Sequence, residues 1–307
     1  MTMESVRDGA TPFPTHASCL LCHRRDLRAL RGYERCHLVR CASCGFVFVA
    51  RIPTEAELEA CYRGKYEENE LGYEWLSPVT SKRFNEWLDF MEPFRKQNRI
   101  LDVGCGAGHF LSHAVARGWE AHGTEYPSNA VERCRNKGIA MRQGGLDPSA
   151  YEAGSFDVVT SLGVIEHVTD PRQDLENMVK LLRPGGLLYI TTPNFNSVSR
   201  HLLRARWNVI MYPEHLSYFT PRTLAAALRA LGLEELRVEA TGFSVSRVRA
   251  SLGNGDTRYM TPTCADERLR AGLEGSPALR RLKSGINRVL TMAGAGDELK
   301  IQFVKPS

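Results

Sequence analysis

The chain has 307 residues, of which 43% are hydrophobic and 24% charged, and its formal net charge is +5. This length allows one large domain and a small accessory domain, and the composition is that of an ordinary globular protein. No apolar run approaches the ~20 residues needed to span a membrane, and no N-terminal apolar segment suggests a signal peptide. We therefore expect a cytoplasmic protein without a membrane partner, whose nine cysteines remain thiols.

Four cysteines near the N-terminus form two Cys-x-x-Cys pairs, Cys19 with Cys22 and Cys41 with Cys44, after a stretch (1–17) that we expect to be a flexible arm. This spacing is typical of a Cys₄ zinc ribbon, which we place at residues 18–65. Four thiolates complete a tetrahedral shell and leave no position for water. The sequence therefore predicts a structural Zn²⁺. Histidines and a further cysteine nearby could replace a ligand, but the paired spacing favours the four cysteines.

Within the same region, after the second cysteine pair, the sequence predicts a helix that begins after Pro53, with Thr54 as N-cap and Glu57 as its capping-box partner. Several aromatic residues come next. They either pack between the ribbon and the main domain or line a substrate pocket; they are Tyr62, Tyr66, Tyr73 and Trp75.

The central feature of the sequence is a short apolar run at residues 100–103, followed by glycines at Gly104, Gly106 and Gly108 and then by an apolar helical pattern. Glycine lacks a Cβ, so the chain can turn sharply and a ligand can lie against its backbone. A strand, a glycine turn and a helix in this order bind nucleotide-type ligands at the end of a parallel strand. Asp102 precedes the glycines, and Glu125 ends the next predicted strand, where it can bind two ribose hydroxyls.

The run Asp-Val-Gly-Cys-Gly-Ala-Gly, together with Glu125, resembles the first two motifs of class I S-adenosylmethionine (SAM) methyltransferases. Residues 155–162, 164–168 and 181–190 resemble the later motifs in the same order, including a Pro-Gly-Gly turn before the fifth strand. The resemblance implies an α/β fold: a Rossmann-like seven-stranded core within residues 66–307. It also implies SAM as cofactor, with a site that consists of Asp102, Gly104, Gly106, Gly108, Glu125, Leu146 and Leu162.

Two regions of the expected core are less regular. Residues 194–220 read as an irregular segment that leaves the fifth strand for the ligand crevice. Residues 247–290 form an insertion with nine Lys and Arg against four Asp and Glu, between expected strands at 236–240 and 298–304. We interpret it as a basic helical lid or as a patch for a diphosphate or phosphopantetheine group.

The candidate general base lies in the irregular segment. His215 follows Glu214 and Tyr212, and an imidazole titrates near neutral pH. Tyr212-x-Glu214-His215 resembles the catalytic segment of sugar C-methyltransferases with a zinc-binding N-terminal part. In that resemblance His215 removes a proton from a carbon next to a ketone, assisted by Tyr212 and Glu214. His167, which follows the fourth strand, is the competing candidate, and a packing role for both histidines stays open.

These observations predict a SAM-dependent methyltransferase acting on a small biosynthetic intermediate, such as a nucleotide- or carrier-linked sugar. The alternative is an RNA methyltransferase whose zinc ribbon binds RNA. Residues 1–65 hold ten Lys and Arg against seven Asp and Glu, a weak footprint for a phosphate backbone, so we do not expect a nucleic-acid partner. A third possibility is a non-catalytic scaffold, against which the intact glycine motif argues. The sequence leaves the oligomeric state open.

Overall fold

The computed structural model describes residues 13–67, 76–244, 248, 251–253, 272 and 276–307, with the backbone alone over residues 62–67. Its helices are α1 (Glu55–Glu67), α2 (Pro78–Met91), α3 (His109–Ala116), α4 (Ser128–Asn136), α5 (Pro171–Leu181), α6 (Val198–Leu203), α7 (Pro221–Ala230) and α10 (Pro277–Ala293). Its strands are β1 (Leu27–Ala29), β2 (Leu38–Cys41), β3 (Val47–Val49), β4 (Arg99–Val103), β5 (Glu120–Glu125), β6 (Ala140–Gln143), β7 (Phe156–Leu162), β8 (Leu182–Pro193), β9 (Ser217–Tyr218), β10 (Glu234–Thr241) and β11 (Glu298–Val304).

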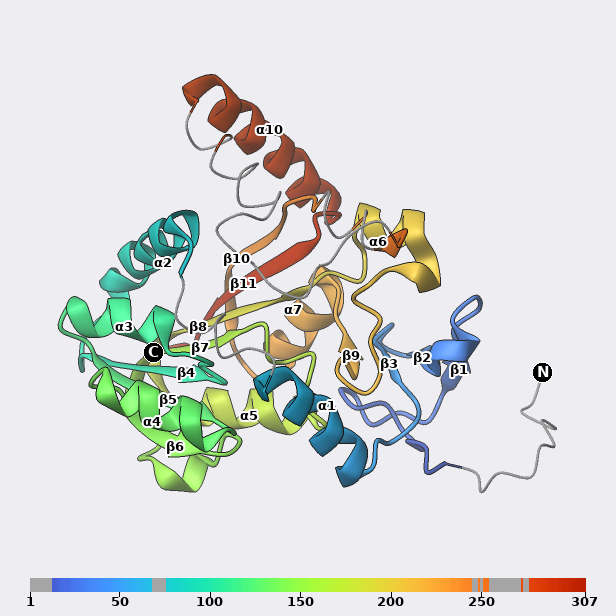
Figure 1. Cartoon of the computed structure of the whole chain (residues 1–307), viewed down its shortest axis with the longest axis horizontal. Helices are drawn as coiled ribbons and strands as arrows, with labels where there is room; N and C mark the ends of the chain where they lie inside the picture. Colours follow the sequence, from blue (N-terminus) through green and yellow to red (C-terminus); the bar gives the residue numbers. More distant parts are fainter. Residues whose placement is uncertain (1–12, 68–75, 245–247, 249–250, 254–271, 273–275) are drawn as a thin grey trace.

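A seven-stranded sheet forms the centre of the molecule, in the order β10-β11-β8-β7-β4-β5-β6 (Figure 1). The strands from β8 to β6 are parallel, whereas β11 lies antiparallel between β8 and β10. The order reverses at β4, so the chain leaves β4 and β7 in opposite directions across the sheet. This arrangement confirms the expected Rossmann-like core and places the glycine turn after β4 at the switch point, where α/β sheets bind their ligands.

Apolar residues alternate between the two faces of the sheet, as the two-residue period of a strand requires. Ile100 packs in the cluster covered by α2, α3 and α4, whereas Leu101 packs in the cluster covered by α5 and α7. Val158 and Val159 divide between the two clusters in the same way. Both faces are therefore buried, which explains why the central strands read as continuous apolar runs.

The predicted Pro-Gly-Gly turn does not separate a helix from the next strand. Instead, it lies within β8: Phe156 pairs with Leu182 and Val158 with Leu187, so residues 183–186 bulge out of the ladder. Arg183 Nε donates to Asp157 Oδ1 at 2.5 Å from this bulge. The buried Asp157 carboxylate thereby gains a charged partner, and the bulge is held against the sheet.

The N-terminal region forms a small sheet in the order β1-β2-β3-β9. Its last strand does not come from the ribbon, because β9 belongs to the segment after β8 that the sequence predicted to be irregular. Val47 pairs with Tyr218, and Phe48 pairs with Ser217. The edge of β3 is buried and needs hydrogen-bond partners, which β9 supplies. That segment also contains α6, so the prediction of an irregular stretch over 194–220 was wrong in part.

Residues 13–17, the described part of the expected flexible arm, are bound to the ribbon. Thr15 forms a β-bridge with Arg51, His16 N donates to Ala50 O at 2.8 Å, and Ile52 N donates to Pro14 O at 2.8 Å. This part of the arm prediction is therefore wrong. The predicted capping box at α1 is present, since Thr54 N and Glu57 N each donate to the other residue's side chain.

Several predictions fall partly outside the described residues. The side chains of Tyr62, Tyr66, Tyr73 and Trp75 lie outside them, as does most of the 247–275 part of the basic insertion. The described remainder of the insertion is mainly α10, which contacts β10. Among the described helices, none has the length and apolar character required to cross a bilayer.

Candidate active site

The glycine turn after β4 has three glycines with positive φ angles, 68° at Gly104, 54° at Gly106 and 70° at Gly108. A Cβ at Gly104 would lie 2.7 Å from Val164 Cγ2, and one at Gly108 would lie 2.7 Å from Cys134 Sγ. A Cβ at Gly106 would meet no atom within 4 Å. The outer glycines thus permit close packing inside the protein, whereas Gly106 leaves open space against bare backbone.

Two buried carboxylates flank this turn. Glu125 is 6% exposed, and it accepts hydrogen bonds from Gly106 N at 2.8 Å and from Tyr126 N at 2.8 Å. Asp102 is 2% exposed and accepts from Thr160 Oγ1 at 2.7 Å. Burial raises the pKa of Asp102 to about 7, with a further contribution from the negative charge of Glu125. A cationic ligand group beside Asp102 would favour the charged carboxylate and so lower this raised pKa.

The other predicted cofactor residues lie at the ends of neighbouring strands. Leu162 ends β7 and packs against the cluster that contains Ile100. Leu146, which is 8% exposed, follows β6, and Gly144 N in the same loop donates to Glu125 O at 2.9 Å. The structure therefore places all seven predicted residues at the ends of β4, β5, β6 and β7, on the edge where the glycine turn lies.

The two candidate bases form one pair, rather than two alternative sites. The rings of His167 and His215 lie 4.6 Å apart between centroids, in an edge-to-face arrangement. His215 Nε2 lies 3.6 Å from Glu214 Oε1, and His167 Nε2 lies 3.9 Å from Glu166 Oε1. Both carboxyl groups are buried, so each imidazole has an acidic partner in a low-dielectric environment.

Backbone carbonyls fix the protonation pattern of both rings. His215 Nδ1 lies 2.6 Å from Val209 O, and His167 Nδ1 lies 2.9 Å from Glu214 O. A carbonyl can only accept, so each Nδ1 carries a proton and donates it. In the neutral ring, Nε2 is then the basic nitrogen. Ligand atoms of Glu166, His167 and His215 lie within 4.8 Å of one another, a set that also suits a divalent cation.

Glu166 connects the segment after β7 to the segment after β8. Its carbonyl accepts from Leu216 N at 2.8 Å and from Ser217 N at 3.0 Å, and its carboxylate accepts from Thr192 Oγ1 at 2.9 Å. The glycine turn contacts the same segment, because Gly104 packs against Val164, whose carbonyl accepts from His167 N at 2.9 Å. These contacts join the glycine turn and the histidine pair into one site.

Tyr212 lies apart from the histidine pair in its hydrogen bonding. Its hydroxyl donates to Glu57 Oε2 on α1 at 3.3 Å, and Arg51 lies over its ring at 5.0 Å from the centroid. Burial raises the pKa of Tyr212, so the hydroxyl remains a donor at neutral pH. The residue thus ties the segment that carries His215 to the N-terminal region.

The four ribbon cysteines converge as the spacing predicts. Cys19 Sγ lies 3.6 Å from Cys44 Sγ, and Cys22 Sγ lies 3.6 Å from Cys41 Sγ, with all four sulfurs within 4.8 Å of one another. A tetrahedral zinc with Zn–S distances of about 2.3 Å holds its sulfurs about 3.8 Å apart. Leu21 N also donates to Cys19 Sγ at 3.4 Å. The residues therefore fit a tetrahedral cation.

Some residues of the site gave no signal in the sequence. Thr160, which donates to Asp102, reads as one more β-branched strand residue, and Thr192 reads the same way in β8. Glu57 was visible as a capping-box residue, but nothing along the chain relates it to Tyr212, which is 155 positions away.

Comparisons with known proteins agree on the class of this site. A family model described as a methyltransferase domain matches residues 79–238. The ubiquinone biosynthesis O-methyltransferase of Bordetella avium is 28% identical over 195 residues, which cover 58% of this chain and 80% of that protein. The protein of the same name from Xanthomonas axonopodis is 32% identical over 170 residues, covering 51% and 71%.

Solved structures show the same fold. A SAM-dependent methyltransferase from Archaeoglobus fulgidus superimposes with a TM-score of 0.52 at 18% identity, covering 78% of this chain and 99% of that one. An N-methyltransferase from Haemonchus contortus, solved with phosphomonomethylethanolamine and S-adenosylhomocysteine, gives a TM-score of 0.53 at 19% identity. This superposition covers 83% of this chain and 61% of the Haemonchus contortus chain.

Proposed function

The chain belongs to the methyltransferase-domain family and is a SAM-dependent methyltransferase, and from this premise we propose which acceptor it methylates and how. The acceptor is a small biosynthetic intermediate, a nucleotide-linked sugar or a related natural-product precursor. His215 is the general base. The observation that carries the proposal is the partly buried His167–His215 pair, whose Nδ1 atoms both donate to backbone carbonyls.

The glycine turn and the residues around it can accommodate the cofactor. SAM, when bound, supplies an electrophilic methyl group. The open space at Gly106 admits a ligand against the backbone, and Glu125 offers a carboxylate for two ribose hydroxyls. Asp102, with its raised pKa, favours a cationic group such as an amine. Leu146 and Leu162 contribute apolar surface at the same edge, suited to the adenine ring.

His215 Nε2 receives the proton that the acceptor loses. The Nδ1 proton is held by Val209 O, so the ring becomes an imidazolium when Nε2 is protonated. Glu214 Oε1, 3.6 Å away, stabilises that charge. The equivalent distance at His167 is 3.9 Å, and Glu166 also accepts a hydrogen bond from Thr192. For this reason we assign the base to His215 and the orientation of the acceptor to His167.

Tyr212 is assigned a positioning role, because its hydroxyl contacts Glu57 rather than either histidine. We also assign a structural Zn²⁺ to Cys19, Cys22, Cys41 and Cys44, whose sulfurs have the separations of a tetrahedral site. The zinc would hold the ribbon, and β9 would transmit that order to the segment that carries His215.

Two observations support a small acceptor. The relatives that match this chain are named for ubiquinone biosynthesis, whose intermediates are small molecules. The Tyr212-x-Glu214-His215 segment resembles that of sugar C-methyltransferases. RNA methylation is the alternative, and the charge balance of residues 1–65 gives it little support.

The test uses SAM with a labelled methyl group and three acceptor sets: nucleotide-linked keto sugars, a fractionated metabolite extract and total RNA. Label in a ribonuclease-resistant nucleotide sugar is the expected result. On that acceptor, His215→Gln should lower kcat about 100-fold or more with unchanged SAM affinity, the effect expected for removal of a general base. Label in RNA would refute the proposed acceptor. A larger loss in His167→Gln than in His215→Gln would refute the assignment of the base.

A further inference from the structure

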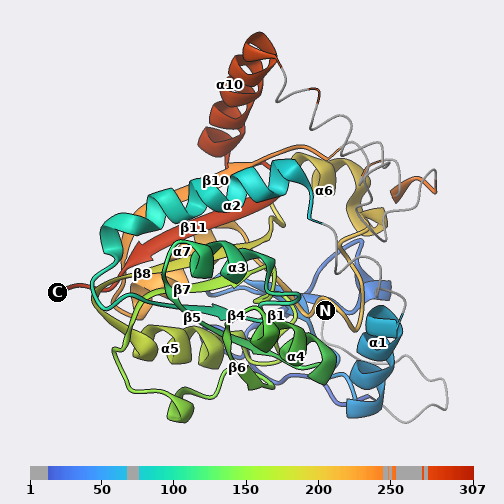
Figure 2. The same ribbon diagram turned by 60° about the vertical axis from the view of Figure 1, so that its left-hand side comes forward.

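Helix α10 (Pro277–Ala293) projects outward beyond β10 in both ribbon views (Figures 1 and 2). It contacts β10 through polar side chains: Thr291 Oγ1 donates to Ala240 O at 3.1 Å, and Gly242 N donates to Asn287 Oδ1 at 3.0 Å. No residue of this helix is fully buried. The packing is the reverse of that in an ordinary surface helix, which turns its apolar side toward the protein.

The exposed large apolar side chains of α10 lie on the side away from β10. At about 3.6 residues per turn, they form a continuous stripe roughly opposite Asn287 and Thr291. We call it the outer stripe. Its members and their exposed fractions are Leu279 (40%), Leu282 (59%), Ile286 (50%), Val289 (66%) and Met292 (83%). A contiguous apolar stripe of this kind on an otherwise polar surface marks an interaction site.

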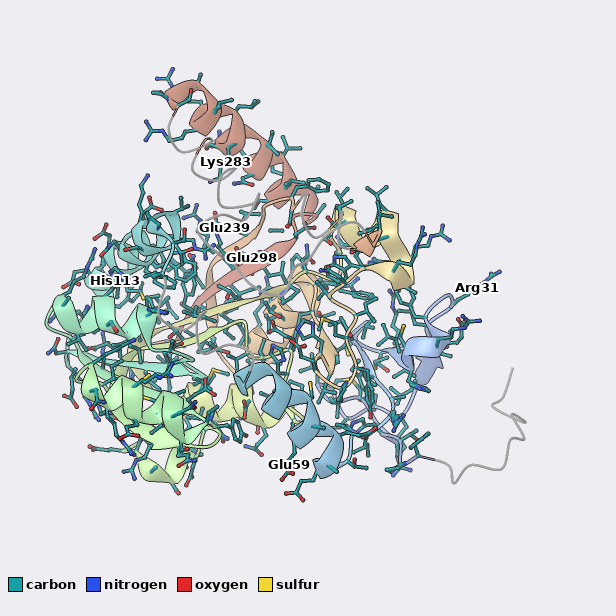
Figure 3. The ribbon with its side chains drawn as sticks, in the orientation of Figure 1. Arg31, Glu59, His113, Glu239, Lys283 and Glu298 are labelled. Carbon is teal, nitrogen blue, oxygen red and sulfur yellow. The ribbon has the colours of Figure 1, made fainter. Side chains whose placement is uncertain are left out.

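The charges of the helix indicate what covers the outer stripe. Four basic residues lie on α10 and no acidic one. By helical position, Lys283 borders the stripe on one side, and Arg281 and Arg288 border it on the other. Figure 3 shows the side chains of α10, with Lys283 labelled, on a helix that extends past the ends of β10 and β11. A second copy of this helix would bring like charges together, whereas an anionic surface would attract them.

We propose that α10 binds an anionic lipid surface. The outer stripe would enter the boundary between headgroups and acyl chains, while the basic side chains would reach the phosphate groups at either side. The expectation of no membrane partner rested on the lack of a spanning segment, and a helix that lies in the interface needs none. The proposal is independent of the acceptor and of the general base.

The first test is co-sedimentation of the full chain with vesicles of phosphatidylcholine alone or of phosphatidylcholine mixed with phosphatidylglycerol. We expect binding to the mixed vesicles only, and weaker binding at higher salt. Leu282→Ser with Val289→Ser should lower the partition constant at least about tenfold, because these exposed side chains supply much of the buried apolar area. SAM affinity and the urea midpoint, which should not change in these variants, report that the protein remains folded.

A charge-matched pair of variants gives the control. Arg281→Glu with Arg288→Glu should lower binding at least about 25-fold, since each basic residue near an anionic surface contributes about fivefold. Arg28→Glu with Arg222→Glu makes the same change in net charge on the ribbon and on α7, and it should have less than about a twofold effect. Equal losses in both pairs would overturn the proposal. Equal binding to both vesicle types, or a dimer that Leu282→Ser with Val289→Ser dissociates, would overturn it as well.

Discussion

The three glycines of the turn after β4 differ in their surroundings, and this difference predicts a separation of binding from stability. At Gly106, a Cβ meets no atom within 4 Å, so a valine there suffers only from the positive φ of 54°. A left-handed conformation costs a non-glycine residue about 1–2 kcal/mol. Gly106→Val should therefore lower the free energy of unfolding by about that amount.

At Gly108, the same substitution meets both strain and overlap. The φ angle is 70°, and the new Cβ would lie 2.7 Å from Cys134 Sγ and 2.9 Å from Ile139 Cδ1. Overpacking of a core costs about 1–3 kcal/mol in addition to the conformational strain. Gly108→Val should therefore cost about 2–5 kcal/mol, roughly twice the effect at Gly106.

The affinity for SAM should change in the opposite order, with the larger loss in Gly106→Val than in Gly108→Val. A valine at Gly106 projects into the space that the cofactor requires, so we expect at least about 100-fold weaker binding, or about 2.7 kcal/mol. Urea unfolding gives the stability of each variant, and isothermal titration calorimetry gives its SAM affinity. Wild-type SAM affinity in Gly106→Val, or a loss of stability as large as that of Gly108→Val, would refute this separation of binding from stability.

Four other predictions follow from the site. Cys19→Ser with Cys22→Ser should lose about one zinc per chain by metal analysis and expose the ribbon to limited proteolysis; zinc-free, protease-resistant wild-type protein would disprove the zinc site. For Asp102, burial raises the pKa in the folded state to about 7 from an ordinary value of 3.8, so the folded state binds more protons between about pH 4 and pH 7. The free energy of unfolding should therefore fall as pH rises through that window, by up to about 4 kcal/mol, and Asp102→Asn should flatten this part of the profile in urea titrations; an unchanged slope would contradict the burial argument. Tyr212→Phe should cost about 0.5–1.5 kcal/mol by removing one hydrogen bond, and Glu57→Gln in the same background should add less than it does alone. Added Mg²⁺ or Mn²⁺ should leave the methylation rate unchanged; a rate that requires the cation would make the histidine pair metal ligands instead.

The residues that the sequence assigned to the cofactor lie together in the fold, because they are close together along the chain. Gly104, Gly106 and Gly108 lie in one turn, and Glu125 ends the following strand. A parallel strand, a turn and a helix can be recognised from local pattern, and the positions of the strand ends then follow from the topology. The same holds for the cysteine pairs, whose spacing alone suggests one tetrahedral site.

The arrangement of the two candidate bases depends on contacts between distant segments, which periodicity does not encode. The sequence suggested His167 and His215 as competing candidates for the general base, whereas the fold places their rings 4.6 Å apart between centroids. The pairing of β9 with β3 and the hydrogen bonds to Glu166 bring the two segments together. Neither contact has a local signature, because β9 covers only Ser217–Tyr218.

By itself, the amino-acid sequence determined the succession of the core strands and helices along the chain, the glycine turn and the chemistry available to each segment, since these depend on short-range pattern and on residue type. Only the tertiary structure decided that two histidines form one pair, that Tyr212 bonds to α1, and that α10 turns its apolar stripe outward. The physical reason is that hydrophobic periodicity specifies which residues share a face of an element, and the surrounding packing decides what that face meets.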